Sequence, residues 1–311
     1  MSAGGAREVV VGIDLGGTKV RAGIAGVDGA VLNELVEPTR RGPELLGQLE
    51  RLVERLAGSV GGARVVATAI GGAGVPDDQE GTFSLAPNLG ELDDVGLVGE
   101  LEARLGHPVV IENDVNIAAL GELTDGVGRG ESSFAFVAVG TGIGVGLVLD
   151  GRLWSGASGG AGEVGYLPIG TDPLDPRNQR RGALEEKLAG DVLARRYAEA
   201  AGATGEITAH DVFERAGAGD PDALAALDEE ARWLAHALVA LDAVVDPGLF
   251  VLGGGIGGRV ELLPPLHTWL ARLGRPALRV RVSALGSAAP ILGAVRLAID
   301  TLVTSTEREA S

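Results

Sequence analysis

The chain has 311 residues, of which 45% are hydrophobic and 22% charged, and these fractions are typical of a globular protein large enough for two domains or one large one. Its net charge of −17 repels nucleic acid and anionic membranes, so we expect neither as a partner. The absence of cysteine excludes disulfides and thiolate metal sites. No signal peptide is visible and no apolar run approaches the roughly 20 residues of a membrane span, so the sequence predicts a cytoplasmic protein.

Strands and helices are expected to alternate in the first half of the chain. Apolar runs predict strands at residues 9–13, 20–25, 31–36, 65–70 and 109–111. Apolar residues at helical spacing predict helices at residues 44–57, 97–105 and 115–123. This alternation favours a layered α/β fold.

The turn after the first strand, in the stretch GIDLGGTK, carries groups suited to a nucleotide phosphate. Gly16 and Gly17 have no Cβ, so their N–H groups can approach a phosphate closely. Thr18 adds a hydroxyl, Lys19 a cation and Asp14 a carboxylate that could hold a hydrated Mg²⁺. An ordinary hairpin with a polar tip is the alternative. The stretch leads into a strand and is neither a Walker loop nor a dinucleotide fingerprint.

A second glycine turn repeats this pattern. Gly140, Thr141, Gly142 and Gly144 lie in the stretch GTGIG, and an Asp-Gly turn follows at residues 150–151. The flanking strands are expected at residues 134–139, 145–149 and 152–154. Because the same order of strands and turns occurs twice, we predict a duplicated domain with two phosphate-binding hairpins that face each other across a cleft.

The rest of the chain is expected to be mostly helical. We predict helices at residues 184–198, 210–216, 221–245, 262–273 and 291–302, and strands at 249–252 and 278–282. Gly253, Gly254 and Gly255 begin a glycine run that matches GxGxxG after a strand, but no acid follows at the spacing that a dinucleotide site needs. A turn against the adenosine of a nucleotide is therefore favoured over a nicotinamide site, with a plain strand–helix turn as the alternative.

Carboxylates at strand ends are the candidate bases and sugar ligands. Asn113 and Asp114 follow the strand 109–111 and open a helix, where ligands usually bind in α/β proteins. A carboxylate there could accept the proton of an attacking hydroxyl, although both residue types are also ordinary helix caps. Further candidates are Glu163, which is flanked by small residues, Glu185 at an expected helix start, and Asn88 in a turn.

Seven motifs occur in the order found in ROK-family bacterial sugar kinases, and the chain most resembles the glucokinase-like members. They are DLGGTK, APNLG, ENDVNIAALGE, VGTGIGVG, GAGEVGYLPI, GALE and LFVLGGGI, and the resemblance covers about residues 8–303. The resemblance implies the two-domain α/β fold of actin-like ATPases, which is ribonuclease H-like, with a central ligand cleft. The implied domains are residues 1–116 with the C-terminal helix 291–311, and residues 117–290.

The resemblance also implies roles for individual residues and an ATP-dependent reaction with Mg²⁺. Asp114 would be the general base. The first phosphate loop would comprise Asp14, Gly16, Gly17, Thr18 and Lys19, and the second Gly140, Thr141, Gly142 and Gly144. The adenosine would lie against Gly253, Gly254 and Gly255. Sugar hydroxyls would bind Asn88, Asn113, Glu163 and Glu185.

One departure from the family concerns zinc and the sugar. The family usually has a histidine and a cysteine-rich loop that together hold a structural zinc ion. Here Tyr166 stands at the histidine position and Ala183 at a cysteine position, and the loop between them has neither residue type. We therefore predict that this zinc site is absent. Because the histidine also helps to hold the sugar, Tyr166 is expected either to donate a hydrogen bond from its hydroxyl or to obstruct the sugar site.

The leading hypothesis is a kinase that transfers the γ-phosphate of ATP to a hexose, with the glucose 6-OH as acceptor. The alternatives are a catalytically silent sugar-binding protein, a kinase for another acceptor such as N-acetylmannosamine, and polyphosphate as the donor. A DNA-binding repressor is disfavoured, since about seven residues precede the first strand and the chain is acidic. The family's habit of forming dimers favours a homodimer.

Overall fold

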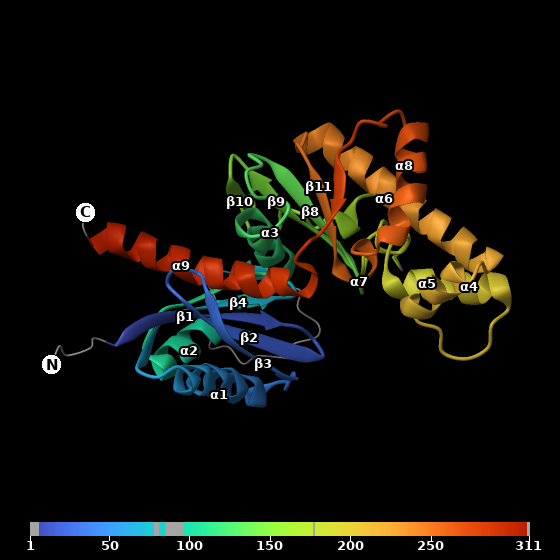
Figure 1. Ribbon diagram of the computed structural model, residues 1–311. Helices are drawn as coiled ribbons and strands as arrows, with labels where there is room; N and C mark the ends of the chain where they lie inside the picture. The colour runs from blue at the N-terminus through green and yellow to red at the C-terminus, as the bar shows by residue number, and fades with distance from the viewer. Residues whose placement is uncertain (1–5, 78–80, 85–95, 177, 310–311) are drawn as a thin grey trace. The chain divides into compact units, whose positions relative to one another are not determined.

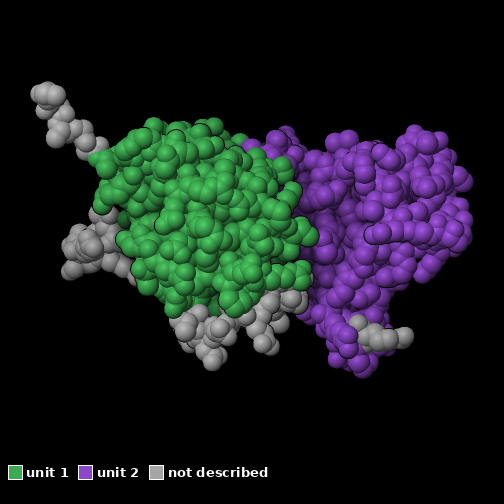
Figure 2. Space-filling view, turned by 90° about the horizontal axis from the view of Figure 1, so that it is seen from below, with its two compact units in different colours: residues 1–129, 155–161, 287–311 green, residues 130–154, 162–286 purple. Residues whose placement is uncertain are grey.

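The computed structural model describes residues 6–77, 81–84, 96–176 and 178–309 (Figure 1). The chain forms two compact units, each built on its own five-stranded sheet (Figure 2). Unit 1 comprises residues 1–129, 155–161 and 287–311, and unit 2 comprises residues 130–154 and 162–286.

The sheet of unit 1 has the strand order β3-β2-β1-β4-β7. Its strands are β1 (Arg7–Leu15), β2 (Lys19–Gly26), β3 (Val31–Pro38), β4 (Ala63–Gly72) and β7 (Val109–Asn113), and β5 (Val75–Asp77) pairs with β6 (Thr82–Ser84) separately. The first three strands are antiparallel neighbours, whereas β4 and β7 run parallel to β1. Alternate residues of β1 therefore face opposite sides of the sheet: Val9 and Val11 pack in one core and Val10 in the other.

Helices cover both faces of this sheet. Helices α1 (Pro43–Ser59) and α2 (Leu97–Leu105) supply leucines to the core that contains Val9 and Val11. Helices α3 (Asp114–Thr124) and α9 (Ala289–Glu309) pack in the core on the opposite face, around Val10. By length and composition Gly286–Val303 is the one stretch in the described part of the chain that could cross a membrane, although no such run was expected from the sequence. Its side chains Ala294, Val295 and Ala298 are buried in unit 1.

Unit 2 repeats the order of antiparallel and parallel strands. Its sheet order is β10-β9-β8-β11-β12, from β8 (Phe134–Val139), β9 (Ile143–Leu149), β10 (Arg152–Trp154), β11 (Phe250–Gly253) and β12 (Val280–Val282). Strands β8, β9 and β10 are antiparallel, and β11 lies parallel to both β8 and β12. The repeated core predicted from the two glycine turns is thus confirmed.

The remaining helices belong mostly to unit 2. They are η1 (Val164–Tyr166), α4 (Gly190–Ala201), α5 (Ala209–Gly217), α6 (Pro221–Val245), α7 (Gly254–Gly257), η2 (Val260–Leu262), α8 (Leu263–Arg272) and the short η3 (Gly286–Ala288) at the passage back to unit 1. The helix predicted at residues 184–198 begins only at Gly190, because residues 183–188 form turns: the N–H groups of Leu184 and Glu185 bond to the carbonyl of Gly165. Glu185 is therefore not a first-turn residue of that helix.

The observed units also differ from the expected domain boundaries. Residues 117–129, 155–161 and 287–290 belong to unit 1 rather than to the second domain. The reason is helix packing, since α3 and α9 lie against each other at two glycines. A Cβ at Gly293 would lie 1.6 Å from the carbonyl oxygen of Ile117, and a Cβ at Gly121 would lie 2.2 Å from that of Ala289. Backbones in such close contact belong to one packed unit.

Substitution of Gly293 by alanine should destabilise unit 1. The added methyl group has to displace the backbone of α3, so we expect the free energy of unfolding to fall by about 3 kcal/mol or more. Urea unfolding followed by circular dichroism measures it. The matched control is Gly99→Ala in α2, where a Cβ meets no atom within 4 Å, and stability should stay unchanged or rise by up to about 1 kcal/mol. Equal stability of Gly293→Ala and the wild type would contradict the close helix contact.

Candidate functional site

The first glycine turn joins β1 to β2 and is held by hydrogen bonds from Thr39. The N–H of Gly16 donates to the carbonyl of Lys19 at 3.1 Å, and the hydroxyl of Thr39 donates to the carbonyl of Gly16 at 2.6 Å. The N–H of Thr39 donates to the carbonyl of Thr18 at 3.1 Å. Among the described residues these contacts leave the N–H groups of Gly17 and Thr18 unused. The turn is therefore a fixed loop with amide donors at its tip, as a phosphate site needs.

Asp14 is a carboxylate whose charged form is disfavoured. It lies in β1, opposite Arg21 of β2 and beside Gly71 of β4. Burial is the largest cause that raises its pKa to about 6, and the charge of Asp114 raises it further, against the opposing effects of Arg21 and Lys19. Asp14 thus lies in the same electrostatic environment as the proposed base.

Asp114 is the first residue of α3, directly after β7. Burial raises the pKa of its carboxyl group, and hydrogen bonds from the backbone N–H groups of Val115 and of Asp114 itself oppose that rise. A carboxylate that is desolvated in this way is a stronger proton acceptor than one in water. The geometry is therefore compatible with a general base.

Asn113 has a capping role that the sequence left open. Its side-chain oxygen accepts from the N–H groups of Val115 at 2.8 Å and Asn116 at 3.2 Å, which makes it the N-cap of α3. Its amide nitrogen donates to the carbonyl of Gly74 at 3.0 Å. Since an amide has two N–H groups, one donor of Asn113 is still available to a ligand.

Glu112 is a site residue to which sequence reasoning gave no role. One carboxylate oxygen accepts from the N–H of Asn113 at 2.7 Å and the side chain of Asn116 at 2.9 Å. The other accepts from the hydroxyl of Ser155 at 2.9 Å. Glu112 therefore fixes the junction of β7 and α3, where Asp114 begins. Its position at the end of a strand is a signal that the sequence contains. Its contact with Ser155 could not be predicted, because the two residues are distant in sequence.

The second glycine turn joins β8 to β9 and is held by a carboxylate. The N–H of Gly140 donates to the carbonyl of Gly142 at 2.9 Å. The N–H of Ile143 donates to Glu185 at 3.0 Å, and a Cβ at Gly142 would lie 2.4 Å from that same carboxylate oxygen. Glycine is thus required at residue 142 for Glu185 to reach the turn. Gly144 lies within β9 rather than in the turn.

The third glycine run packs against this second turn. Gly254 has φ of 79°, and a Cβ there would lie 2.4 Å from the carbonyl oxygen of Val139 at the end of β8. A Cβ at Gly253 would lie 2.3 Å from the ring of Phe136, and a Cβ at Gly140 would lie 3.7 Å from the backbone nitrogen of Gly255. The structure therefore brings together the two glycine runs of unit 2 that sequence reasoning assigned to a nucleotide.

The candidate sugar ligands of unit 2 also lie together. The carbonyl of Gly165 in η1 accepts from the N–H groups of Leu184 at 3.1 Å and Glu185 at 3.3 Å, which brings η1 to the segment of Glu185. Glu163 directly precedes η1 and is exposed, and Tyr166 ends it with 48% of its surface exposed. Asn88 lies outside the described residues.

The loop that carries zinc ligands in the resembling family is held here by hydrogen bonds. The Thr171 hydroxyl donates to the carbonyl of Ala183 at 2.9 Å, and the Asn178 side chain donates to the carbonyl of Asp172 at 2.8 Å. No group of three or more His, Cys, Asp or Glu residues in the described part of the chain is arranged to hold a metal ion. The absence of zinc stays a prediction, which metal analysis of the purified protein would test.

A magnesium ion fits the donor set of unit 1. Mg²⁺ binds through one or two carboxylates together with water and phosphate oxygens, so it needs no cage of protein ligands. Asp14 offers a hard oxygen donor whose negative charge is destabilised by burial and by Asp114, and a divalent cation would relieve that cost. Among the described residues, the charges of Arg21 and Lys19 oppose this rise in the pKa of Asp14.

Comparison with known proteins gives consistent matches over almost the whole chain. The ROK family matches residues 10–301. A glucokinase of Streptomyces coelicolor is 33% identical over an alignment 317 residues long, gaps included, and the alignment covers 93% of this chain and 97% of the relative. Two similar crystal structures are a ROK hexokinase from Thermus thermophilus and a ROK family glucokinase from Streptomyces griseus in complex with glucose and AMPPNP. The hexokinase has a TM-score of 0.81 and 34% identity, and the match covers 95% of this chain and 99% of the hexokinase. The glucokinase has a TM-score of 0.78 and 31% identity, and the match covers 93% of this chain and 99% of the glucokinase.

Replacement of Asp14 by asparagine should stabilise the protein at neutral pH. The pKa of Asp14 is about 6 in the folded protein, against an ordinary value of 3.8 that applies to the unfolded chain. Its ionised form therefore destabilises the fold above pH 6, and this cost disappears as the pH falls toward 3.8. We expect Asp14→Asn to raise the free energy of unfolding by about 3 kcal/mol at about pH 7.5 and by only about 1 kcal/mol at about pH 4.5.

Urea titrations at the two pH values test this expectation. Asp28→Asn is the matched control, because this aspartate is exposed in a turn of unit 1, where it accepts from the N–H of Ala30 as an asparagine also can. The control should change stability equally little at both pH values. An Asp14→Asn variant whose gain does not depend on pH would show that Asp14 carries no raised pKa.

Proposed function

The chain belongs to the ROK family, and from this premise we propose that it is an ATP-dependent sugar kinase, with the 6-OH of glucose as its acceptor. The family membership and the repeated sheets confirm the predicted fold class, the α/β fold of actin-like ATPases. The observation that carries the proposal is the position of Asp114: a desolvated carboxylate at the start of α3, in the same electrostatic environment as Asp14 on the glycine hairpin.

Asp114 is the proposed general base. A sugar hydroxyl is a weak nucleophile, and Asp114 accepts its proton as the hydroxyl oxygen bonds to the γ-phosphorus of ATP. The bond from the γ-phosphorus to the bridging oxygen breaks, and ADP leaves with that electron pair. The raised pKa of Asp114 increases its basicity, and the network of Glu112, Asn113 and Ser155 keeps the start of α3 in place.

The glycine turns are the proposed phosphate-binding elements. The amide groups of Gly17 and Thr18 in unit 1 would donate to phosphate oxygens, and Lys19 would add a positive charge. Gly16 would shape this loop, because its own N–H donates to the carbonyl of Lys19. In unit 2 the same role falls to the turn from Gly140, while the glycines that begin at Gly253 border the adenosine. Asp14 would hold Mg²⁺ through water, and a bound Mg²⁺ supplies positive charge against the transferring phosphoryl group.

The acceptor would be held by amide, carboxylate and phenol groups, and Tyr166 decides its identity. The proposed sugar ligands are Asn88, Asn113, Glu163, Tyr166 and Glu185. Because Tyr166 stands where the family usually has the histidine that helps to hold the sugar, N-acetylmannosamine is kept as the alternative acceptor and a silent sugar-binding protein as the alternative function. The proposed location is the cytoplasm, and the proposed assembly is a homodimer, which the habit of the family favours.

The proposed base can be tested by substitution. In a coupled assay with Mg·ATP and a panel of hexoses and amino sugars, we expect turnover on at least one sugar. Asp114→Asn should lower kcat for that sugar by about 10²–10⁴-fold with a small change in KM, because the amide cannot accept the proton. The matched control is Asp125→Asn at the exposed end of α3, which should keep wild-type kcat. If every sugar is inert while nucleotide still binds, the silent sugar-binding protein is the correct alternative.

A second substitution tests the role of Tyr166. If its hydroxyl donates a hydrogen bond to the sugar, Tyr166→Phe should raise KM for the acceptor by about 2–10-fold and leave kcat nearly unchanged. The control is Tyr197→Phe, the other tyrosine of the chain, whose hydroxyl donates to Asp220 at 3.0 Å within unit 2. That variant should alter stability but not KM. An unchanged KM for Tyr166→Phe would show that the hydroxyl makes no hydrogen bond to the sugar, and a lowered KM would identify the hydroxyl as an obstruction.

A further inference from the structure

We propose that Arg181 is a positioning residue that ties the second glycine turn to the carboxylate of Glu185, so that the proposed nucleotide and sugar contacts of unit 2 are ordered together. The hydrogen bonds of Arg181 are observed in the structure. The assignment of the glycine turn to the nucleotide and of Glu185 to the sugar rests on the proposed function. Arg181 lies in the loop between η1 and α4 and was not selected from the sequence.

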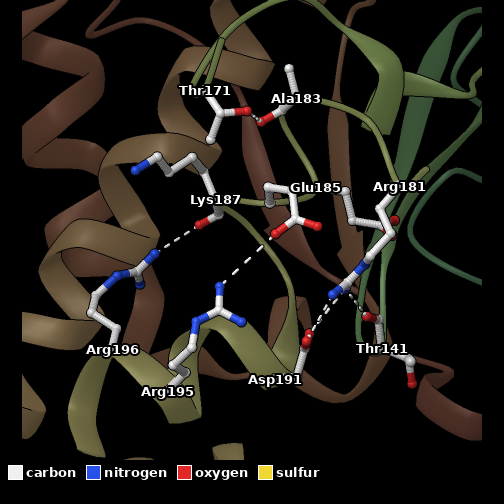
Figure 3. Close-up of polar contacts among 10 residues, drawn as sticks. Thr141, Thr171, Arg181, Ala183, Glu185, Lys187, Asp191, Arg195 and Arg196 are labelled. Carbon is white, nitrogen blue, oxygen red and sulfur yellow. Dashed lines mark hydrogen bonds and ion pairs between the residues drawn. The ribbon is translucent and has the colours of Figure 1, made fainter. Parts of the chain in front are cut away.

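The guanidinium of Arg181 uses all three of its nitrogens (Figure 3). Two of them form a fork on Asp191 in the first turn of α4, with Nη1 to Oδ2 at 2.7 Å and Nη2 to Oδ1 at 2.9 Å. Its Nε donates to Oε1 of Glu185 at 3.1 Å, and its Nη2 also donates to the carbonyl of Thr141 at 3.3 Å. One side chain therefore connects a helix, a candidate sugar ligand and the tip of the glycine turn.

Glu185 completes the connection from its other oxygen. While Oε1 accepts from Arg181, Oε2 accepts from the N–H of Ile143, the residue at which β9 begins. The turn of residues 140–142 is thus held at its tip, Thr141, by Arg181 and at the residue after it, Ile143, by Glu185. Movement of either segment would break hydrogen bonds of the other, which couples them mechanically.

The chemistry of the cluster requires arginine. A guanidinium presents a planar fork that matches the carboxylate of Asp191 and still has an Nε–H for Glu185, whereas a lysine ammonium is a single point of charge. The side chains of Arg181 and Glu185 are 31% and 19% exposed, so solvent screens this pair less than an ion pair on the open surface. The hydrogen bonds from Arg181 also lower the pKa of Asp191, which keeps that carboxylate ionised.

Removal of the guanidinium should loosen the turn without removing any proposed ligand. In Arg181→Ala the carbonyl of Thr141 loses its side-chain donor. Glu185 loses the hydrogen bond from Arg181 and keeps the one from the N–H of Ile143. The amide of Ile143 should then exchange its hydrogen faster. Because Arg181 itself is not proposed to touch the substrate, an effect on nucleotide binding would pass through the turn.

The test measures turn dynamics and nucleotide binding on the full chain. Hydrogen exchange of peptides over residues 139–148 should be at least about tenfold faster in Arg181→Ala, and the Kd for Mg·AMPPNP by calorimetry should rise about tenfold, as expected for loss of a charge-assisted hydrogen bond. Arg181→Lys should give a smaller change in both. The matched control is Arg180→Ala, an exposed neighbour in the same loop, which should behave as wild type.

The outcomes separate this proposal from the proposed function. Exchange and Kd that equal the wild-type values in Arg181→Ala would overturn the positioning role. If Arg181→Ala does not fold, Arg181→Lys decides by the same readouts, and wild-type values in that variant overturn the role as well. Hydrogen exchange needs no substrate, so a wild type that binds no Mg·AMPPNP or phosphorylates no sugar would contradict the proposed function and leave the exchange result valid.

Discussion

Close approach of backbone to its neighbours at glycine is the constraint on which both units depend. In unit 1, Gly293 and Gly121 let α9 lie directly on α3, the helix that begins with Asp114. In unit 2, Gly142 leaves room for the carboxylate of Glu185, and Gly254 lies on the end of β8. The high glycine content of the chain, 51 residues in 311, therefore has particular consequences for where the functional groups lie.

Two carboxylates of unit 1, Asp14 and Asp114, lie where their ionised forms are disfavoured. Burial raises the pKa values of both Asp14 and Asp114, and the charge of Asp114 adds to the effect on Asp14. A carboxyl group whose pKa is raised in the folded state lowers the stability of the fold when it is ionised, so the sequence retains these two charges at a cost in stability. Such arrangements are characteristic of functional sites, where desolvated acids relieve their cost when a cation or a proton arrives.

The elements that sequence reasoning predicted well are those whose signal is local. Both glycine hairpins and their flanking strands follow from apolar runs and turn residues, and the order of strands in the two units agrees with the duplication. The predictions differ from the structure where contacts between residues distant in sequence determine an element. Helix α4 begins later than predicted because residues 184 and 185 bond to Gly165. The domain boundary expected after residue 116 falls inside α3, because α9 packs against that helix. The roles of Glu112 and Arg181 were overlooked for the same reason, since each has one partner far along the chain, Ser155 and Thr141 respectively.

Transfer of the terminal phosphate of ATP to a sugar hydroxyl is the reaction proposed for this chain, and phosphorus NMR of the reaction mixture observes both the phosphate lost and the phosphate ester formed. With glucose and Mg·ATP, we expect the γ-phosphate resonance to be lost while a phosphomonoester resonance appears in equal amount, split by the two protons of carbon 6. The appearance of inorganic phosphate alone, or an unchanged ATP spectrum with every sugar tried, would contradict it.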